Sequence, residues 1–353
     1  MTEIEQILDD TGLRYVSDSE KGITREKAGE KFIYLDNKRQ KVTDETVLER
    51  IKKLVLPPAW TTVWIANKSN AHLQATGFDA AKRKQYRYHS DWSKRRNETK
   101  YFRLLEFGSK LSDFRKNILK DLRRKDLDER KVLAVSVNMM QKTLIRVGNE
   151  AYKQLYGSYG LTTLRDRHVK IEGNSLKLSF VGKKGVEHEI KLTDKSLARL
   201  VKKCRDIPGQ ELFQYYTSGG ERRSIDSGKI NRYIREISSC DFTAKDFRTW
   251  SGSLETLRQL ASVEYPENEN LRKKIVNSAL DEVSSKLGNT RTVCKKSYVF
   301  PALLEAYFDG SLLPFLKKIN KAAGSVNSKA LDHDEKVLLH FLRAERNKKR
   351  AAG

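Results

Sequence analysis

The chain has 353 residues, of which 38% are hydrophobic, so it can bury two or three globular cores and is not a disordered tail. Lys and Arg number 70 against 46 Asp and Glu, and the formal net charge of +24 exceeds what solubility needs and favours nucleic acid as the partner. Neither an apolar run of about 20 residues nor a signal peptide is evident, so membrane insertion and export are not expected.

Residues 1–90 are predicted to form a small, mainly β N-terminal domain. The strand-like segments KFIYLD, TTVWIAN, AHLQATGFD and KQYRYH alternate with one helical segment, ETVLERIKKLVL, which Pro57 and Pro58 end. The polar and basic stretch from His89 to Lys100 follows, and the domain junction is placed there. The fold class expected for the whole chain is therefore α+β, because helical periodicity dominates beyond this stretch.

Residues 91–345 are predicted to form a mainly α-helical second domain, and residues 346–353 a disordered basic tail. In KVLAVSVNMMQKTLIRVGNEAYKQLYG, apolar residues from Leu133 to Leu155 recur at steps of four or three. This spacing predicts one continuous helix with a buried face. A further core helix is expected to begin at Pro301, because proline suits the first helical position.

A different rhythm interrupts the helices between Leu161 and Leu192. Apolar and polar residues alternate there, and turn-forming residues stand at Glu172–Asn174 and Lys183–Gly185. Alternation with a period of two is typical of half-buried strands. The sequence therefore predicts a three-stranded antiparallel sheet within the helical domain.

The cysteine and histidine residues do not indicate a metal site. Cys204, Cys240 and Cys294 are widely separated and lack the C-x-x-C spacing of zinc ligands, so reduced thiols are the simplest interpretation. The six histidines form no H-x-x-x-H or H-x-H pair, and no phosphate-binding G-x-x-x-x-G-K-[ST] loop is present. No metal ion and no cofactor are predicted.

Five short pieces of the second domain carry the candidate chemistry. Arg146 lies in LIRVGNE beside the apolar face of the predicted helix, Lys183 at the tip of the predicted hairpin FVGKKGVEHEI, and Arg248 in FTAKDFRTWSG. Asn289 follows a glycine, and Tyr298 comes nine positions later. Each residue alone also has a structural interpretation, such as a turn lysine or a surface ion pair. The information lies in their order along one chain.

In that order the pieces resemble the type IB DNA topoisomerases, specifically the small poxvirus-like enzymes of viruses and bacteria. IRVGNEAY, GLTTLRDRHVKI, FVGKKGVEHE, KDFRTWSG and the loop that ends at the tyrosine are similar to that family's motifs. The resemblance implies that Tyr298 is the nucleophile, that Arg146, Lys183 and Arg248 are catalytic cations, and that Asn289 occupies the remaining active-site position. Histidine is usual there in viral and eukaryotic members, so the asparagine is a departure.

The first domain extends the resemblance over nearly the whole chain. PPAW and QATGFDAAKRKQYRYHSDW are similar to the N-terminal DNA clamp of the bacterial branch, although Lys82 stands where a glycine is expected. An edge strand with charged side chains would explain RKQYRYH equally well if the second domain were ignored. The candidates for DNA contact fall in two groups. Gln85, Tyr86 and Tyr88 are expected to contact base edges, and Arg83, Lys84 and Arg87 are expected to contact phosphates.

The resemblance implies an enzyme that relaxes positive and negative DNA supercoils by cutting one strand through a 3′-phosphotyrosine and religating it, without ATP or metal. The two arginines would donate to the non-bridging phosphate oxygens, Lys183 would protonate the leaving 5′ oxygen, and Asn289 would give one neutral hydrogen bond. We expect duplex DNA, preferably supercoiled, as the partner of a monomer that encloses it as a clamp, and an intracellular, DNA-associated location, bacterial or viral. No membrane partner is expected.

Two other classes stay open on the residues alone. A tyrosine recombinase shares the helical domain, two arginines and the nucleophilic tyrosine, but it generally has His-x-x-Arg where this chain has KDFR, and histidine where Asn289 stands. The PPAW-containing first domain also fits that class poorly. A catalytically inactive DNA-binding relative is the second alternative, and the presence of the three cations together with Tyr298 argues against it.

Overall fold

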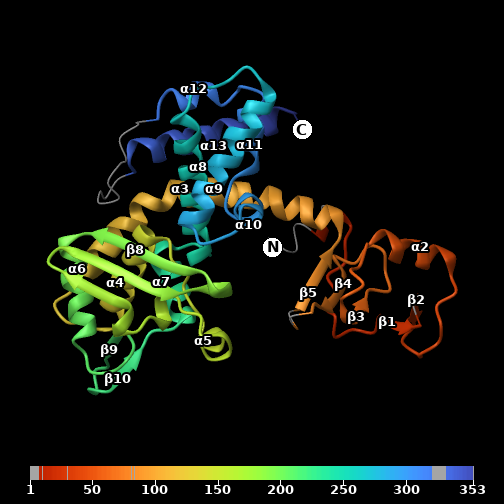
Figure 1. Ribbon diagram of the computed structural model, residues 1–353, viewed down its shortest axis with the longest axis horizontal. Coiled ribbons are helices and arrows are strands. Elements are labelled where there is room, and N and C mark those ends of the chain that lie inside the picture. Colours follow the sequence, from red (N-terminus) through yellow and green to blue (C-terminus); the bar gives the residue numbers. More distant parts are fainter. Residues whose placement is uncertain are drawn as a thin grey trace. The chain divides into compact units, whose positions relative to one another are not determined.

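A computed structural model describes residues 8–9, 11–29, 31–80, 82, 84–319 and 331–352. The chain folds as two units, Met1–Tyr101 and Phe102–Gly353. The first contains an antiparallel sheet and the second is mainly helical with a smaller sheet, so the predicted α+β class is confirmed (Figure 1). The junction predicted after residue 90 falls on the first residue of helix α3 (Ser90–Leu122), which contains residues of both units.

The first unit is built on a five-stranded antiparallel sheet in the order β2-β1-β3-β4-β5. Four of its strands coincide with segments predicted from sequence, whereas β1, with the sequence ITREKA, was missed because its alternation carries few apolar residues. The strands are β1 (Ile23–Ala28), β2 (Lys31–Leu35), β3 (Thr61–Ile65), β4 (Leu73–Phe78) and β5 (Lys84–Tyr88).

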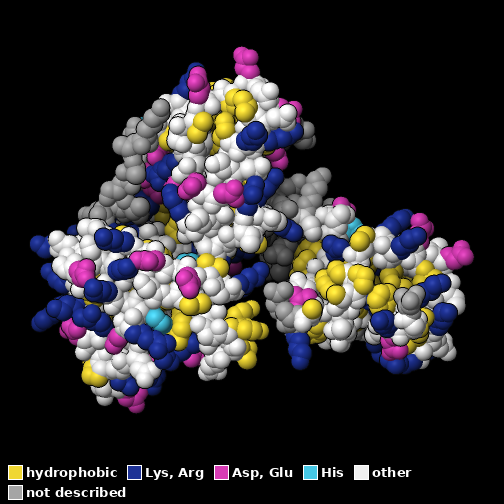
Figure 2. Space-filling view, viewed as in Figure 1, with side chains coloured by type: hydrophobic (Ala, Val, Ile, Leu, Met, Phe, Trp, Pro, Cys, Tyr) yellow, Lys and Arg dark blue, Asp and Glu magenta, His cyan; other side chains and the backbone are white. Residues whose placement is uncertain are grey.

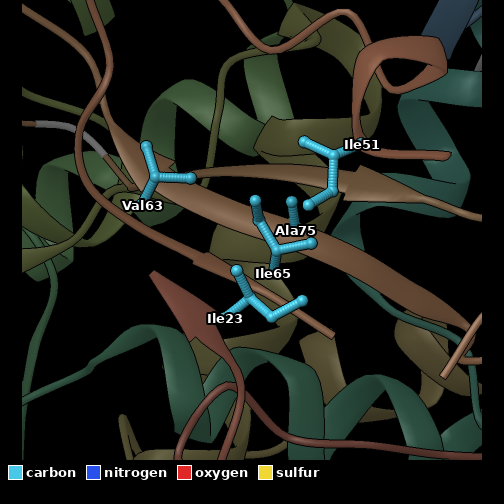
Figure 3. Close-up of a cluster of buried hydrophobic side chains, with 5 residues drawn as sticks. All are labelled: Ile23, Ile51, Val63, Ile65 and Ala75. Carbon is cyan, nitrogen blue, oxygen red and sulfur yellow. The ribbon is translucent and has the colours of Figure 1, made fainter. Parts of the chain in front are cut away.

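Helix α2 (Glu45–Lys53) covers this sheet because its apolar residues are spaced to form one buried face. Asp44 caps its first turn by accepting hydrogen bonds from the amides of Thr46 and Val47. The core beneath it is small, and Figure 3 shows its buried side chains, which are Ile23, Ile51, Val63, Ile65 and Ala75. The predicted helix is thus present, and it ends before the two prolines.

The second unit consists largely of helices. Among the described residues, no helix is long and apolar enough to cross a membrane. Beyond α3, the helices are α4 (Glu129–Thr143), α5 (Glu150–Tyr156), α6 (Lys195–Arg205), α7 (Ser227–Ser238), α8 (Ala244–Ala261), α9 (Glu269–Lys286), α10 (Arg291–Ser297), α11 (Pro301–Phe308), α12 (Leu313–Leu316) and α13 (His333–Ala352).

Two of these helices bear on predictions made from the sequence. Helix α11 begins at Pro301, the residue at which the sequence predicts a helix. Helix α13 continues to Ala352, through residues for which a disordered basic tail is predicted. Its last residues, NKKRAA, include lysine, arginine and alanine, which are strong helix formers, and this explains why the helix extends so far.

The continuous helix predicted through Arg146 is wrong, because the chain leaves the helix between α4 and α5. Leu144 adopts a left-handed conformation with φ of 57°, and Gly148 has φ of 91°, which only glycine adopts easily. The carbonyl of Arg146 accepts a hydrogen bond from the amide of Leu161 at 2.8 Å instead of from a helical partner. This hydrogen bond to a distant segment outweighs the helical preference that the local periodicity indicates. Arg146 therefore lies between the two helices and not within either of them.

The predicted three-stranded antiparallel sheet is present, in the order β6 (Val169–Glu172), β7 (Ser175–Val181) and β8 (Glu187–Thr193). One face packs against α4 and α6, with which β8 and β7 make contacts (Figure 1). The turn Lys183–Gly185 joins β7 to β8, so Lys183 lies at a hairpin tip as predicted. A short second hairpin, β9 (Gln214–Tyr216) and β10 (Arg222–Ser224), was not predicted.

A buried ion pair fastens α13 to α3. The two terminal nitrogens of Arg115 donate to the two carboxylate oxygens of Glu335, each at 2.7 Å, and the side chains are only 9% and 4% exposed. Trp250 of α8 donates its indole N–H to the same carboxylate at 3.3 Å. The Glu335 carboxylate of α13 therefore binds side chains of both α3 and α8, and these bonds help to fix the position of α8.

Replacing Glu335 with alanine is expected to lower the free energy of unfolding of the second unit by about 3–5 kcal/mol, because it leaves the Arg115 guanidinium buried without its carboxylate. Chemical denaturation followed by tryptophan fluorescence measures this. The matched control is Glu269→Ala, which removes the exposed partner of Lys273 in an i, i+4 pair and is expected to change stability by about 0–1 kcal/mol. Equal effects of the two substitutions would contradict the assigned role of the pair.

Candidate active site

Arg248 lies in the second turn of α8, and its position follows from how that helix begins. Thr243 and Asp246 form a capping box, and Arg103 of α3 donates to the Asp246 carboxylate at 2.7 Å. Arg248 is 4% exposed, and its guanidinium donates to the carbonyl of Leu287 at 2.7 Å and to that of Leu144. A buried charge thus joins the ends of α4 and α9.

Arg146 and Asn289 come together at the same place. The guanidinium of Arg146 donates to the carbonyl of Gly288 at 2.9 Å and to the side-chain oxygen of Asn289. Because arginine can only donate, the amide oxygen of Asn289 must face it. The amide nitrogen then faces away, and it is buried without a hydrogen-bond partner among the described residues. One neutral amide donor is therefore left unused beside two arginines.

Tyr298 stands at the end of α10, where its amide donates to the carbonyl of Cys294 at 2.9 Å. Its backbone lies so close to α8 that a methyl group on Gly252 would come within 2.5 Å of the Tyr298 carbonyl oxygen. The hydroxyl of Ser253 accepts a hydrogen bond from the amide of Phe300 at 3.1 Å. The guanidinium carbon of Arg248 lies 4.9 Å from the centre of the Tyr298 ring. Helix α8 therefore both packs against the backbone of Tyr298, at Gly252, and places Arg248 beside its ring.

These cations change the acidity of the tyrosine. Burial raises the pKa of the Tyr298 hydroxyl, but the positive charge of Arg248, with smaller contributions from Arg146 and Lys245, outweighs burial and holds the pKa below the usual value of a tyrosine. A lower pKa means a larger fraction of phenolate near neutral pH. The arrangement can therefore activate a phenol and bind an anion at the same point.

Lys183 is not part of this cluster. Its ammonium lies 5.1 Å from the ring centre of Tyr152 in α5, and the lysine is exposed at the hairpin tip. Helix α5 presents further apolar side chains to solvent, since Leu155 is 72% exposed and Tyr156 is 61% exposed, and hydrophobic side chains gather over α5 in Figure 2. The structure thus brings together Arg146, Arg248, Asn289 and Tyr298 and places Lys183 against a neighbouring helix.

Comparison with known proteins gives this cluster a family. Residues 84–312 match the family described as eukaryotic DNA topoisomerase I, catalytic core, and residues 31–79 match the bacterial DNA topoisomerase IB N-terminal domain. The DNA topoisomerase 1B of Acanthamoeba polyphaga mimivirus is 35% identical over 295 residues, which are 81% of this chain and 87% of the relative. The chain belongs to the type IB DNA topoisomerases.

More distant relatives agree with this assignment. The DNA topoisomerase 1B of Vaccinia virus (strain Copenhagen) is 24% identical over 247 residues, covering 69% of this chain and 74% of the relative. The DNA topoisomerase 1 of Daucus carota is 28% identical over 205 residues, covering 54% of this chain and 24% of the relative. The protein is therefore a DNA topoisomerase whose substrate is DNA, and the recombinase alternative is not retained.

In the N-terminal unit of this topoisomerase, β5 carries the residues predicted to contact DNA. Arg83 lies outside the described residues. Lys84 forms an ion pair with Asp18 at 2.5 Å, and Arg87 donates to the carbonyls of Leu54 and Val55, each at 2.9 Å. The two cations predicted to meet phosphates thus already have partners within the fold.

The three predicted base-contacting residues differ in their surroundings. Gln85 donates to the carboxylate of Asp79 at 2.8 Å. Tyr86 is 49% exposed, and its ring is stacked with that of Tyr88, with 6.1 Å between the ring centres. Tyr88 is half-buried, so the exposed ring of Tyr86 is the one that presents the kind of surface on which bases stack. Whether these side chains contact DNA stays a prediction.

Reasoning from the sequence missed two residues near the tyrosine. Lys245 precedes Arg248 by three residues in α8, which places both on one side of the helix, and it contributes to the lowered pKa of Tyr298. His188 of β8 lies against Gly288, and only the structure shows this. The spacing Lys-x-x-Arg was available in the sequence as a signal for Lys245. Within the described part of the chain, no group of His, Cys, Asp and Glu side chains is placed to hold a metal ion.

The pKa of Tyr298 is expected to rise when Arg248 is replaced by glutamine, because the largest contribution that lowers it is removed while burial, which raises it, persists. The chemical shift of tyrosine Cζ in ¹³C-labelled protein, followed against pH, measures this, and Tyr298→Phe identifies the resonance. Lys245→Gln is the matched control and is expected to shift the pKa in the same direction by a smaller amount. An unchanged pKa in the Arg248 variant would show that burial alone governs this hydroxyl.

Proposed function

We propose that the enzyme relaxes positive and negative DNA supercoils by cutting one strand through a 3′-phosphotyrosine at Tyr298 and then religating it. The observation that carries this proposal is the convergence of Arg146 and Arg248 on the Tyr298 phenol. Within the described residues, neither arginine forms an ion pair with a carboxylate. Two cations without a carboxylate form a site for an anion, and the scissile phosphate of DNA is the anion that the family's substrate supplies.

In the proposed cleavage step, the Tyr298 oxygen attacks phosphorus and the bond from phosphorus to the 5′ oxygen breaks. The phenol proton leaves to solvent, which the lowered pKa makes easier. Negative charge grows on the two non-bridging oxygens, and Arg146 and Arg248 stay protonated and stabilise it through charge-assisted hydrogen bonds. The phosphodiester energy is kept in the phosphotyrosine, so religation by the reverse reaction requires neither ATP nor a metal ion.

Lys183 is proposed as the general acid that gives its proton to the departing 5′ oxygen. An alkoxide leaving group is very basic, and a positioned proton donor typically contributes about 10²–10⁴-fold to the rate. The hairpin tip gives the long side chain freedom to leave Tyr152 and reach the phosphate once DNA is bound.

Asn289 is proposed to donate its free amide nitrogen to a non-bridging oxygen. Its amide oxygen is already bound to Arg146, so the unused donor has a fixed orientation. A neutral donor is about half as strong as a charged one, so this contribution is smaller and less sensitive to pH than that of a histidinium.

In the proposed complex, a monomer encloses duplex DNA as a clamp, with contacts from both units, and the free 5′ end rotates about the intact strand. Gln85, Tyr86 and Tyr88 are proposed to read base edges, and Arg83, Lys84 and Arg87 to meet phosphates, the latter two by exchanging the partners described above. Supercoiled DNA is proposed as the preferred substrate. We place the enzyme inside the cell with DNA, in a bacterial nucleoid or with viral DNA.

Tyr298→Phe is expected to abolish relaxation and the covalent adduct, while the affinity for a duplex changes by less than about threefold, because one hydroxyl adds little to an interface dominated by phosphate contacts. A plasmid relaxation assay without added cofactor and a denaturing gel of labelled duplex measure activity and adduct. Ser297→Ala, which removes a hydroxyl from the neighbouring residue, is the control and is expected to keep both. An adduct that persists in the Tyr298 variant would refute the assignment of the nucleophile.

Lys183→Ala is expected to slow cleavage by about 10²–10⁴-fold, because the leaving 5′ oxygen loses its proton donor. A duplex whose 5′ bridging oxygen is replaced by sulfur should recover most of this loss, since a thiolate leaves without protonation. Single-turnover cleavage of the two substrates measures the ratio. Lys184→Ala removes the adjacent turn lysine and serves as the control. If sulfur fails to restore the Lys183 variant, another group is the acid.

A further inference from the structure

His188 occupies a narrow place between two glycines that belong to different parts of the site. A methyl group on Gly182 would come within 2.7 Å of the His188 ring, and one on Gly288 within 2.4 Å of it. Gly182 immediately precedes Lys183 at the base of the hairpin turn, and Gly288 immediately precedes Asn289. The imidazole is thus packed directly against the backbone of both segments.

Further contacts fix the ring and connect it to the cations. The His188 ring is stacked on that of Phe180, with 4.9 Å between ring centres and 17° between the planes. Gly182 donates its amide to the carbonyl of Val186 at 2.7 Å, which closes the turn below Lys183. On the other side, the carbonyl of Gly288 accepts the hydrogen bond from Arg146. One ring therefore lies between the hairpin that carries Lys183 and the loop that anchors Arg146.

We propose that His188 is a positioning residue that sets the distance and orientation of the Lys183 hairpin relative to the Gly288–Asn289 loop. This inference rests on the proposed function, in which Lys183 must reach the 5′ oxygen of a phosphate held by the arginines. General-acid catalysis requires hydrogen-bond distance, and a misplacement of about 1 Å can cost about 10²-fold in rate. Packing between two glycine backbones is a means of setting such a distance.

The electrostatics of the site agree with a spacer that carries no charge. Burial lowers the pKa of His188, and the positive charges of Arg146 and Arg248 lower it further, so the imidazole is neutral near neutral pH. Its neighbours on the strand, Glu187 and Glu189, are exposed on the opposite face of the sheet. A neutral ring adds no repulsion between the hairpin and the arginines, whereas a lysine or arginine there would.

The decisive test compares cleavage of the oxygen and sulfur substrates by His188→Ala. The expected result is a loss of about 10²-fold with the 5′ oxygen and recovery of most of it with the 5′ sulfur, because only the proton donor is misplaced. His168→Ala is the matched control, since His168 is a buried histidine that also lies near Phe180, at 6.5 Å, and is not among the nearest contacts of either glycine. It is expected to lose no more on one substrate than on the other.

A second variant keeps the test valid if His188→Ala folds poorly. Gly182 has φ of −94°, which any residue adopts, so Gly182→Ala adds only the methyl group that meets the ring. It is expected to show the same selective loss on the oxygen substrate. Removing the ring as well, in the double variant with His188→Ala, should relieve the clash and make the double variant no slower than His188→Ala alone.

The outcomes separate this inference from the proposed function. If Lys183→Ala recovers with sulfur but His188→Ala is slow on both substrates, His188 supports the arginine loop or the fold and the positioning role is overturned. If His188→Ala cleaves the oxygen substrate at the wild-type rate, the role is likewise overturned. If Lys183→Ala itself does not recover, the assignment of the acid fails first. Combining His188→Ala with Lys183→Ala should add little further loss, because both act through one proton transfer.

Discussion

The arrangement of the site depends on one buried guanidinium. Arg248 donates to the carbonyl of Leu144, where α4 ends, and to that of Leu287, where α9 ends, and it lies against the Tyr298 ring. These two carbonyls are helix-end acceptors, which carry partial negative charge and have no intrahelical partner. One side chain therefore satisfies two helix ends, and in doing so it brings the segments that carry Arg146 and Asn289 to the tyrosine.

The same interaction explains why the site favours an anion. Burying a charge is costly unless it is paired, and carbonyl dipoles offset only part of the penalty for Arg248. Within the described residues neither Arg248 nor Arg146 has a carboxylate partner, whereas the buried Arg115 is paired with Glu335. Two cations without a carboxylate partner therefore lower the stability of the fold, and a phosphate oxygen bound between them would offset part of this cost. This is the electrostatic preorganisation that phosphoryl transfer requires.

Much of this could be predicted from the sequence, and the failures have a common cause. The sheet, the hairpin tip at Lys183 and the helix at Pro301 follow from local patterns, and the order of the five pieces identified the family. The break at Leu144 could not be predicted, because the apolar spacing continues through it and the amide that replaces the helical bond comes from Leu161. The place of His188 likewise depends on a loop about a hundred residues away in the chain. Contacts between distant segments leave no local signal.

Lys183 lies over the ring of Tyr152, and this contact could hold the proposed proton donor away from the site. An exposed cation–π contact is worth about 0.5–1 kcal/mol, whereas a hydrogen bond to a charged group is worth about 1.5–3 kcal/mol. A bound phosphate can therefore draw the lysine from the ring at little cost, provided that the hairpin base already stands at the right distance. The weak contact governs only the side chain, and the packing at Gly182 governs the backbone that carries it. The placement of the proposed proton donor therefore depends mainly on the hairpin backbone that this packing holds in position.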